Sequence, residues 1–154
     1  MPISCIVFDL DFTLWNAGGT WCDHTSPPYR KINQHVVDSE NNEIVLYADV
    51  LSILAILREK YVLAVASRTY QPAWARELMK LLEIEPYFSY FEIYPSTKTV
   101  HFHSLRDQTG ISFRNMLFFD DEMQNVHDVA QLGVTGILVH DGITKDIIRI
   151  QLKP

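Results

Sequence analysis

Five short apolar runs, separated by segments with helical patterning, restrict the fold of this chain more than any other feature. The runs cover residues 3–8, 62–66, 88–93, 116–119 and 136–139. They are apolar throughout rather than alternating, which is typical of strands in a parallel sheet that is covered on both faces. Strands that alternate with helices are joined by right-handed crossovers in such sheets. The pattern therefore predicts an α/β fold.

The segments between the runs carry helix signals. Asp49 can cap one helix, whose apolar face lies within residues 50–57, and Pro72 suits the first turn of another. Further helices are expected over about residues 99–107, 125–132 and 143–152. Five strands of this kind commonly take the order 3-2-1-4-5 when they are numbered along the chain. We therefore expect a doubly wound, five-stranded parallel sheet of the Rossmann-like kind.

The segment over about residues 16–47 breaks this rhythm. It is polar, it contains paired glycines and paired prolines, and its Asn41-Asn42 dipeptide suits a hairpin turn. The segment is too short for a domain of its own. We expect a small insertion of β-hairpins or loops after the first strand, within a single domain that covers residues 1–154.

Composition and charge exclude several classes of protein. Apolar residues make up 47% of the chain and charged residues 21%, as in ordinary globular domains. Lys and Arg number 13 against 19 Asp and Glu, so a basic surface for nucleic acid or an anionic membrane is not expected. No apolar run approaches the roughly 20 residues of a membrane span, and the first residues lack a secretory signal. Cys5 and Cys22 make no disulfide framework, which favours a reducing compartment and a cytoplasmic location.

Two acidic clusters follow two of the apolar runs. Asp9 and Asp11 come after the first run, and Asp120 and Asp121 come directly after the fourth. Neighbouring carboxylates repel each other, so such pairs indicate a cation site or a proton-transfer site, although turn formation and helix capping are the alternatives. Several carboxylate oxygens in one place bind a hard cation, usually Mg²⁺ when phosphate is bound as well.

Ser67 and Lys98 complete the set of polar signals. Ser67 follows the second run, and Lys98 precedes the helix expected over residues 99–107. A hydroxyl beside the N–H groups of a helix start can bind an anion, although a helix cap and a solvated surface lysine are the ordinary roles of such residues. In the order 3-2-1-4-5, strands 2 and 4 flank strand 1, and the loop after strand 3 reaches the same edge. The sequence therefore predicts one site from four separate signals.

These signals resemble the four motifs of the haloacid dehalogenase superfamily of phosphohydrolases. Within that superfamily the chain is most similar to the magnesium-dependent phosphatase type. The similarity rests on residues 8–15, 66–69, 92–95, 98, 119–122 and 132–135. It extends from about residue 6 to residue 139 and is weakest over residues 17–42. It implies the fold of that superfamily, an Mg²⁺ cofactor and a phosphorylated substrate.

The resemblance also implies roles for the acidic residues. Asp9 would be the nucleophile that forms an aspartyl-phosphate. Asp11 would protonate the leaving oxygen and then deprotonate the attacking water. The Asp9 carboxylate, the Asp11 backbone carbonyl and Asp121 would hold Mg²⁺, with Asp120 acting from outside the ligand set.

Other residues take supporting roles in the same resemblance. Ser67 and Lys98 would bind the phosphoryl oxygens, and Arg68 is expected to reach the substrate. Thr13 would fix the loop of the first motif, and a plain cap is an equally good interpretation of this residue. Trp15 lies just past the nucleophile, so we expect it to form a partial wall of the substrate site together with the loop around residues 21–29.

The leading hypothesis is an Mg²⁺-dependent phosphomonoesterase with an open site, because the insertion is too short for a large cap. Phosphotyrosine in proteins, sugar phosphates and phosphorylated glycation adducts are candidate substrates. The main alternative is a non-enzymatic phospho-acceptor module of the receiver type. That module needs its acceptor Asp after strand 3, where residues 94–96 contain none. A catalytically silent phosphoprotein-binding domain is a third interpretation, against which the intact Asp9, Asp11 and Lys98 argue.

Overall fold

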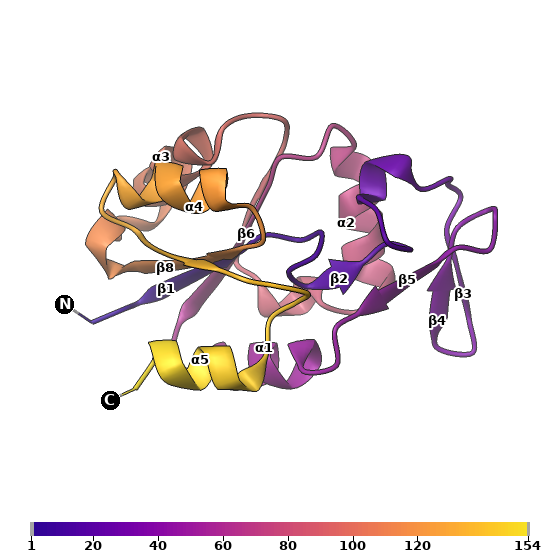
Figure 1. Cartoon of the computed structure of the whole chain (residues 1–154), viewed down its shortest axis with the longest axis horizontal. Helices are drawn as coiled ribbons and strands as arrows, with labels where there is room; N and C mark the ends of the chain where they lie inside the picture. Colours follow the sequence, from indigo (N-terminus) through magenta and orange to yellow (C-terminus); the bar gives the residue numbers. More distant parts are fainter. Residues whose placement is uncertain (1, 154) are drawn as a thin grey trace.

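A parallel sheet forms the centre of the molecule, which is described over residues 2–153 by a computed structural model (Figure 1). The sheet has five strands in the order β7-β6-β1-β8-β9. All four pairings between them are parallel. The strands are β1 (Cys5–Phe8), β6 (Val62–Ser67), β7 (Tyr90–Ile93), β8 (Met116–Asp120) and β9 (Thr135–Leu138). Counted along the chain, these strands lie in the predicted order 3-2-1-4-5, and their labels differ only because four short strands intervene.

Helices cover both faces of this sheet, so each strand is apolar on both sides (Figure 1). In β1, Ile6 and Phe8 belong to the core on the side of α1 and α2, whereas Cys5 and Val7 belong to the core on the side of α3 and α4. The helices are α1 (Val50–Leu57), α2 (Pro72–Leu81), α3 (Lys98–Thr109), α4 (Met123–Ala130) and α5 (Lys145–Gln151). Three short 3-10 helices are η1 (Cys22–His24), η2 (Glu85–Tyr87) and η3 (Phe113–Asn115).

The helix ends agree with the sequence signals except at Asp49. Pro72 is the first residue of α2, and Gly110 ends α3 in the left-handed conformation with φ 72°. Asp49 precedes α1 as predicted, but its side chain makes no cap to that helix. Its carboxylate instead accepts a hydrogen bond of 3.0 Å from the backbone N–H of Lys145, at the start of α5. The prediction of a capping role within α1 was therefore wrong, because the N–H it satisfies belongs to a distant helix.

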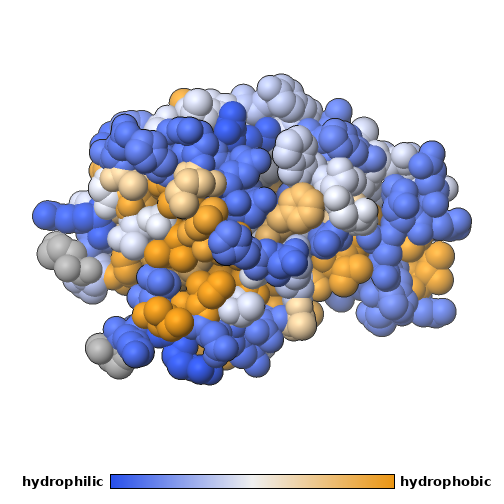
Figure 2. All heavy atoms as spheres, viewed as in Figure 1, coloured by the Kyte–Doolittle hydropathy of each residue, from blue (hydrophilic) through white to orange (hydrophobic). Residues whose placement is uncertain are grey.

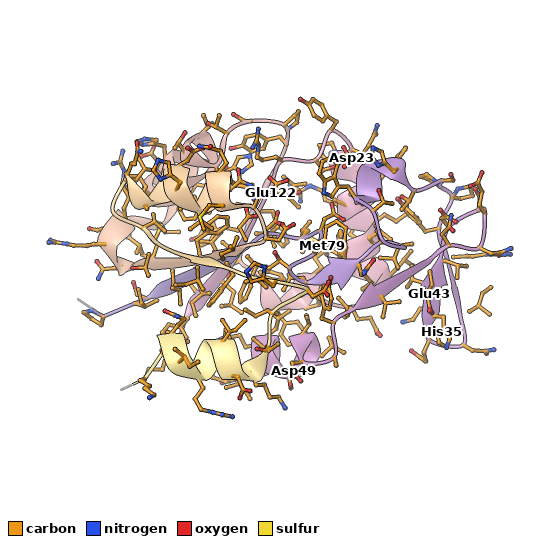
Figure 3. The ribbon with its side chains drawn as sticks, viewed as in Figure 1. Asp23, His35, Glu43, Asp49, Met79 and Glu122 are labelled. Carbon is orange, nitrogen blue, oxygen red and sulfur yellow. The ribbon has the colours of Figure 1, made fainter. Side chains whose placement is uncertain are left out.

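The inserted segment forms a small antiparallel sheet in the order β2-β5-β4-β3. Its strands are β2 (Trp15–Asn16), β3 (Arg30–Ile32), β4 (His35–Val37) and β5 (Glu43–Leu46). The Asn41-Asn42 dipeptide lies in the β4–β5 turn, with Asn41 at φ 64°, as the sequence predicts. His35 and Glu43 form a hydrogen bond on this hairpin, which lies away from the parallel sheet (Figure 3).

Asp38 organises the turn of the inserted sheet. Its side chain is fully buried and accepts hydrogen bonds from the backbone N–H groups of Ser26, Glu40 and Asn42 and from the Asn42 side chain. All of these donors belong to the inserted segment. Asp38 therefore stabilises this segment from within.

The surface is mixed in polarity. On the face shown in Figure 2, hydrophobic atoms gather between α4 and α5, where the edge strand β9 runs, and hydrophilic atoms cover the outer parts of the helices. Within residues 2–153, no helix is both long enough and apolar enough to cross a lipid bilayer.

Candidate active site

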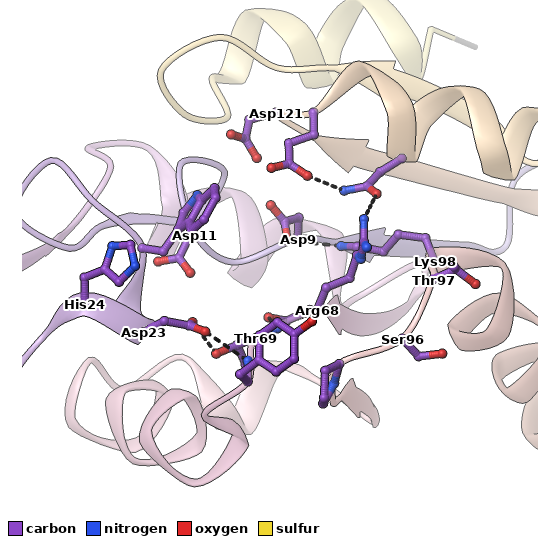
Figure 4. A pocket seen from close by; sticks show the side chains of 16 residues that line it. Asp9, Asp11, Asp23, His24, Arg68, Thr69, Ser96, Thr97, Lys98 and Asp121 are labelled. Atoms are coloured by element: carbon purple, nitrogen blue, oxygen red, sulfur yellow. Dashed lines mark hydrogen bonds and ion pairs between the residues drawn. The ribbon is translucent and has the colours of Figure 1, made fainter.

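The four polar signals meet at the carboxyl edge of the parallel sheet. Asp9 follows β1, Ser67 ends β6, Asp120 ends β8 and Lys98 begins α3. Since β6 and β8 flank β1, the topology brings these strand ends together. Asp9, Asp11, Ser67, Arg68, Lys98 and Asp121 line one cavity of about 720 Å³ (Figure 4). The prediction that they share one site is confirmed.

Lys98 lies at the centre of the acidic cluster. Its ammonium nitrogen is 3.1 Å from Oδ1 of Asp9, 3.0 Å from Oδ2 of Asp120 and 2.6 Å from the Ala66 carbonyl oxygen. The Lys98 side chain is 1% exposed and that of Asp120 is fully buried. Burial lowers the pKa of Lys98, but the two carboxylates outweigh it and raise that pKa above its usual value. Lys98 is therefore a permanent cation at the floor of the cavity.

One lysine does not neutralise the carboxylates around it. Burial and the charge of Asp120 raise the pKa of Asp9 well above its usual value, although Lys98 opposes this shift. Burial, together with Asp120 and Glu122, raises the pKa of Asp121 to about 6. The cluster thus carries more negative charge than the protein compensates.

The same cluster fits a hard divalent cation. Carboxylate oxygens of Asp9, Asp120 and Asp121 lie within 4.8 Å of one another. Oxygen donors in this number are what Mg²⁺ binds in proteins, and a cation would remove the repulsion that raises the pKa of Asp9. Asp120 already contacts Lys98 and Asn125, whereas Asp121 lines the cavity. This geometry favours Asp9 and Asp121 over Asp120 as direct ligands.

Asp11 lines the same cavity and is held by groups of the inserted segment. Its Oδ1 accepts hydrogen bonds of 2.7 Å from Nε1 of Trp15 and of 2.9 Å from the backbone N–H of Cys22. Burial raises the pKa of Asp11 to about 6, even though both hydrogen bonds lower it. A carboxyl group that titrates near neutral pH is suited to both giving and taking a proton.

Trp15 does not form a wall of the substrate site. Its side chain is fully buried, and it lies in β2, paired with β5. The prediction for this residue was wrong because the indole turns inward to donate its N–H to Asp11. The other predicted part of the wall, the loop around residues 21–29, does line the cavity through Trp21, Asp23 and His24.

The phosphate-binding candidates lie on one side of Asp9. Ser67 is buried, and its hydroxyl accepts a hydrogen bond of 3.4 Å from the backbone N–H of Thr69. The Arg68 guanidinium reaches across the cavity and donates to Oδ1 of Asn125 at 3.0 Å. Thr13 is buried and donates to Oδ2 of Asp9 at 3.4 Å, which fits its expected role in holding the first loop.

Asn125 also belongs to the site, although the sequence pattern predicts it only as the start of a helix. Its side chain is buried and donates to Asp120 and Glu122 while it accepts from Arg68. Asn125 therefore links the acidic cluster to a phosphate-binding candidate. A signal was present, because Asn125 stands one helical turn after the acids, where a side chain on α4 points back at the strand end.

Tyr70 was also missed because no local pattern marks it, and Asp23 and His24 were predicted only as part of the loop around residues 21–29, without individual roles. Asp23 lies beside α2 and Glu122 lies at the start of α4, on the two sides of the cavity (Figure 3). Trp21 is 48% exposed and Tyr70 is 77% exposed, so aromatic rings border the mouth of the cavity. These residues come from segments about 50 positions apart, which only the fold brings together.

Comparison with known proteins agrees with the geometry. A family model described as Acid Phosphatase matches residues 2–154. The chain belongs to this family. It is 42% identical to human Magnesium-dependent phosphatase 1 over 140 residues, which are 89% of this chain and 78% of the human protein. It is 37% identical to a HAD-like hydrolase superfamily protein of Schizosaccharomyces pombe, over 85% of this chain and 82% of that protein. The predicted relationship to the magnesium-dependent phosphatase type of the haloacid dehalogenase superfamily is confirmed.

Solved structures show the same fold. A HAD family enzyme from Bacteroides thetaiotaomicron, in complex with magnesium and inorganic phosphate, superposes with a TM-score of 0.70 at 15% identity, over 95% of this chain and 98% of that one. A haloacid dehalogenase-like family protein from Streptococcus pneumoniae superposes with a TM-score of 0.66 at 17% identity, over 98% of this chain and 92% of that one. The predicted fold class is therefore confirmed.

Proposed function

We propose that this chain is an Mg²⁺-dependent phosphomonoesterase that acts through an aspartyl-phosphate on Asp9. The observation that carries the proposal is the position of Asp9, which lines the cavity between Lys98 and the acidic pair that ends β8. Family membership and the human relative's name as a magnesium-dependent phosphatase support it.

Asp9, Asp121 and the backbone carbonyl of Asp11 are the groups that would hold Mg²⁺ in this proposal. When bound, the cation supplies positive charge that offsets the carboxylates and the phosphoryl oxygens. Asp120 stays outside the ligand set and holds Lys98 at 3.0 Å. Lys98, Ser67 and Arg68 bind the phosphoryl oxygens from the other side.

Asp9 and Asp11 carry the chemical steps. A carboxylate oxygen of Asp9 attacks phosphorus, so a new P–O bond forms while the bond to the leaving oxygen breaks, and Asp11 gives its proton to that oxygen. Asp11 then accepts a proton from a water molecule that attacks the phosphorus of the aspartyl-phosphate. Inorganic phosphate is released and the Asp9 carboxylate is restored. A pKa of about 6 for Asp11 supports both proton transfers near neutral pH.

The open cavity supports substrates whose phosphate stands on a bulky body. Within residues 2–153, the inserted segment contributes only Trp21 and residues of η1 to the cavity border, and no large cap encloses the site. We propose phosphotyrosine on proteins, sugar phosphates and phosphorylated glycation adducts as the substrate classes. Weak contacts to the remote part of a simple ester predict a high KM for small substrates. Comparison of kcat/KM for phosphopeptides and phosphorylated metabolites ranks these classes.

Trapping of the phosphoenzyme tests the proposal. The protein is mixed with a radiolabelled aryl phosphate and Mg²⁺, quenched in acid, and the label on the chain is measured before and after hydroxylamine, which cleaves acyl-phosphates. We expect hydroxylamine-sensitive label on wild type and none on Asp9→Asn. Asp128→Asn is the matched control, because Asp128 is a half-buried acid on α4 that does not line the cavity and, within residues 2–153, accepts a side-chain hydrogen bond only from Gln124. Turnover by Asp9→Asn, or by wild type in chelator, contradicts the proposal.

A further inference from the structure

Asp23 joins the inserted segment to the loop that follows β6. Its Oδ2 accepts a hydrogen bond of 3.0 Å from the backbone N–H of Tyr70, and its Oδ1 accepts one from the Thr69 hydroxyl. These partners follow directly on Ser67 and Arg68, the phosphate-binding candidates. The Asp23 carboxylate thus connects the inserted segment to residues that lie 46 and 47 positions further along the chain. The dashed contacts between Asp23 and this loop are visible in Figure 4.

The residue before Asp23 contacts the proposed acid. The backbone N–H of Cys22 donates to Oδ1 of Asp11 at 2.9 Å, and the Trp15 indole donates to the same oxygen. With two N–H donors on Oδ1, that oxygen must act as the acceptor, so the proton of the neutral acid resides on Oδ2. Cys22 and Trp15 therefore together determine which oxygen of Asp11 delivers the proton, and Cys22 is the donor that belongs to the same 3-10 helix as Asp23.

Cys22 is fully buried, and its carbonyl oxygen accepts hydrogen bonds from the Thr25 hydroxyl and the Thr25 backbone N–H, so these two bonds stay within the inserted segment. η1 is a single turn, and Trp21 before it provides no side-chain cap. The chain leading into it passes through Gly18 and Gly19, both at positive φ and both free to adopt other conformations. The Cys22 sulfur contacts the Thr69 hydroxyl at 3.6 Å, a weak interaction. The two hydrogen bonds of Asp23 are the strong contacts between η1 and the loop after β6.

We propose that Asp23 is a positioning residue, which fixes the proton-donating geometry of Asp11 relative to the phosphate-binding loop. The inference rests on the proposed function, because it takes Asp11 as the proton donor. Asp23 acts through Cys22 and touches no reacting atom. Its removal is expected to weaken proton delivery while phosphate binding at Ser67 and Lys98 persists.

Dependence on the leaving group provides a readout that a purely structural role would not change. Phenyl phosphate and 4-nitrophenyl phosphate have similar shapes, but phenolate needs a proton far more than the weakly basic 4-nitrophenolate does. The measured quantity is kcat/KM, which reports the step that expels the leaving group. For Asp23→Ala we expect a loss of about tenfold to hundredfold on phenyl phosphate and at most about threefold on 4-nitrophenyl phosphate. Inhibition by inorganic phosphate is expected to stay the same.

A conservative variant and a second variant sharpen the test. In Asp23→Asn the amide oxygen can still accept from the backbone N–H of Tyr70, and the amide N–H can donate to the Thr69 hydroxyl. We therefore expect kcat/KM on both substrates to stay within about threefold of wild type. Thr69→Val removes one donor to Asp23 and is expected to show the same selective loss as Asp23→Ala, to a smaller extent. This variant replaces Asp23→Ala if the latter does not fold.

Asp38→Ala is the matched structural control. Asp38 belongs to the same inserted segment, but all its hydrogen bonds stay within that segment. Loss of the Asp38 carboxylate is expected to lower stability and to change kcat/KM on both substrates by the same factor. Equal losses on the two substrates in Asp23→Ala, or no loss, overturn the inference. Asp11→Asn tests the proposed acid separately from the role of Asp23. Equal losses of kcat/KM on the two substrates in Asp11→Asn contradict Asp11 as the acid, whereas a larger loss on phenyl phosphate leaves only the role of Asp23 in question.

Discussion

The inserted segment and the carboxyl edge of the parallel sheet each contain a buried acid, and the pKa values of these two acids are shifted in opposite directions. Burial would raise the pKa of Asp38, but hydrogen bonds from Asn42 and Ser26 hold it below its usual value. Burial and a neighbouring carboxylate raise the pKa of Asp9 well above its usual value. Asp38 accepts four hydrogen bonds from N–H donors, whereas Asp9 accepts a long one of 3.4 Å from Thr13 and shares the ammonium of Lys98 with Asp120.

The opposite pKa shifts distinguish Asp38, which stabilises the fold, from Asp9 and its neighbouring acids, which are candidates for catalysis and metal binding. A carboxylate surrounded by N–H donors gains nothing from a cation and cannot readily act as a nucleophile. Carboxylates that repel one another destabilise the metal-free protein and gain free energy when a cation or a phosphoryl group arrives. Substitution of each kind of acid is therefore expected to have a different effect on activity and stability.

Asp9→Asn is expected to abolish turnover and to stabilise the metal-free protein. The amide cannot attack phosphorus, and it removes a buried negative charge that Asp120 and Asp121 repel. Steady-state assays and thermal unfolding in chelator measure the two effects. A fall in the metal-free melting temperature would show that Asp9 is a structural acid like Asp38.

Asp11→Asn is expected to lower kcat/KM on phenyl phosphate by about 10²–10⁴-fold, the usual contribution of acid–base catalysis. The Mg²⁺ concentration for half-maximal activity is expected to stay the same, because the proposed contact of Asp11 with Mg²⁺ is its backbone carbonyl. A titration of activity with Mg²⁺ checks both points. A weakened Mg²⁺ response with unchanged rate at saturation would contradict the assigned role.

Asp121→Asn is expected to raise the Mg²⁺ requirement while much of the rate returns at saturating metal. Loss of an outer partner of a metal site costs about 10–100-fold in affinity, and loss of a ligand is expected to cost at least as much. Glu122→Gln is a suitable control, since Glu122 bonds Asn125 and belongs to no carboxylate group around the cation site. Equal Mg²⁺ curves for wild type and Asp121→Asn would remove Asp121 from the ligand set.

Asp38→Ala is expected to lower the free energy of unfolding by about 1–3 kcal/mol, the cost of leaving buried donors unpaired. Because the folded pKa of Asp38 is lowered, its stabilisation is present above the unfolded pKa and is lost as the pH falls through the folded pKa. The stability difference between wild type and variant should therefore narrow in acid. Denaturant unfolding at several pH values measures this, and a difference that grows in acid contradicts it.

The strand order and the shared site could be predicted because both depend on local patterns. Continuous apolar runs identify buried parallel strands, and a polar residue at a strand end lies at the sheet edge whatever the rest of the chain does. Asp9, Ser67 and Asp120 all satisfy this rule. Lys98 follows the strand β7 and reaches the same edge for the same reason.

Side-chain direction and distant partners could not be predicted in this way. Trp15 lies next to the first motif, but its residue type does not say whether the indole faces the cavity or the core. Asp49 stands at the position of an N-cap for α1, yet its side chain accepts a hydrogen bond from the backbone N–H of Lys145, 96 positions away. Asp23 and Asn125 likewise depend on partners from other elements.

The sheet, its strand order and the edge at which the acids gather follow from the amino-acid sequence, because apolar runs and the polar residues that end them are local features of consecutive residues. Which acids have enough hydrogen-bond donors, and which still repel neighbouring carboxylates, depends on the tertiary structure. A hydrogen bond needs a donor within about 3 Å in the right direction. For Asp23 that donor comes from the loop after β6, and for Asp9 the single ammonium of Lys98 comes from α3, so only the packing of these elements sets the charge balance of the site.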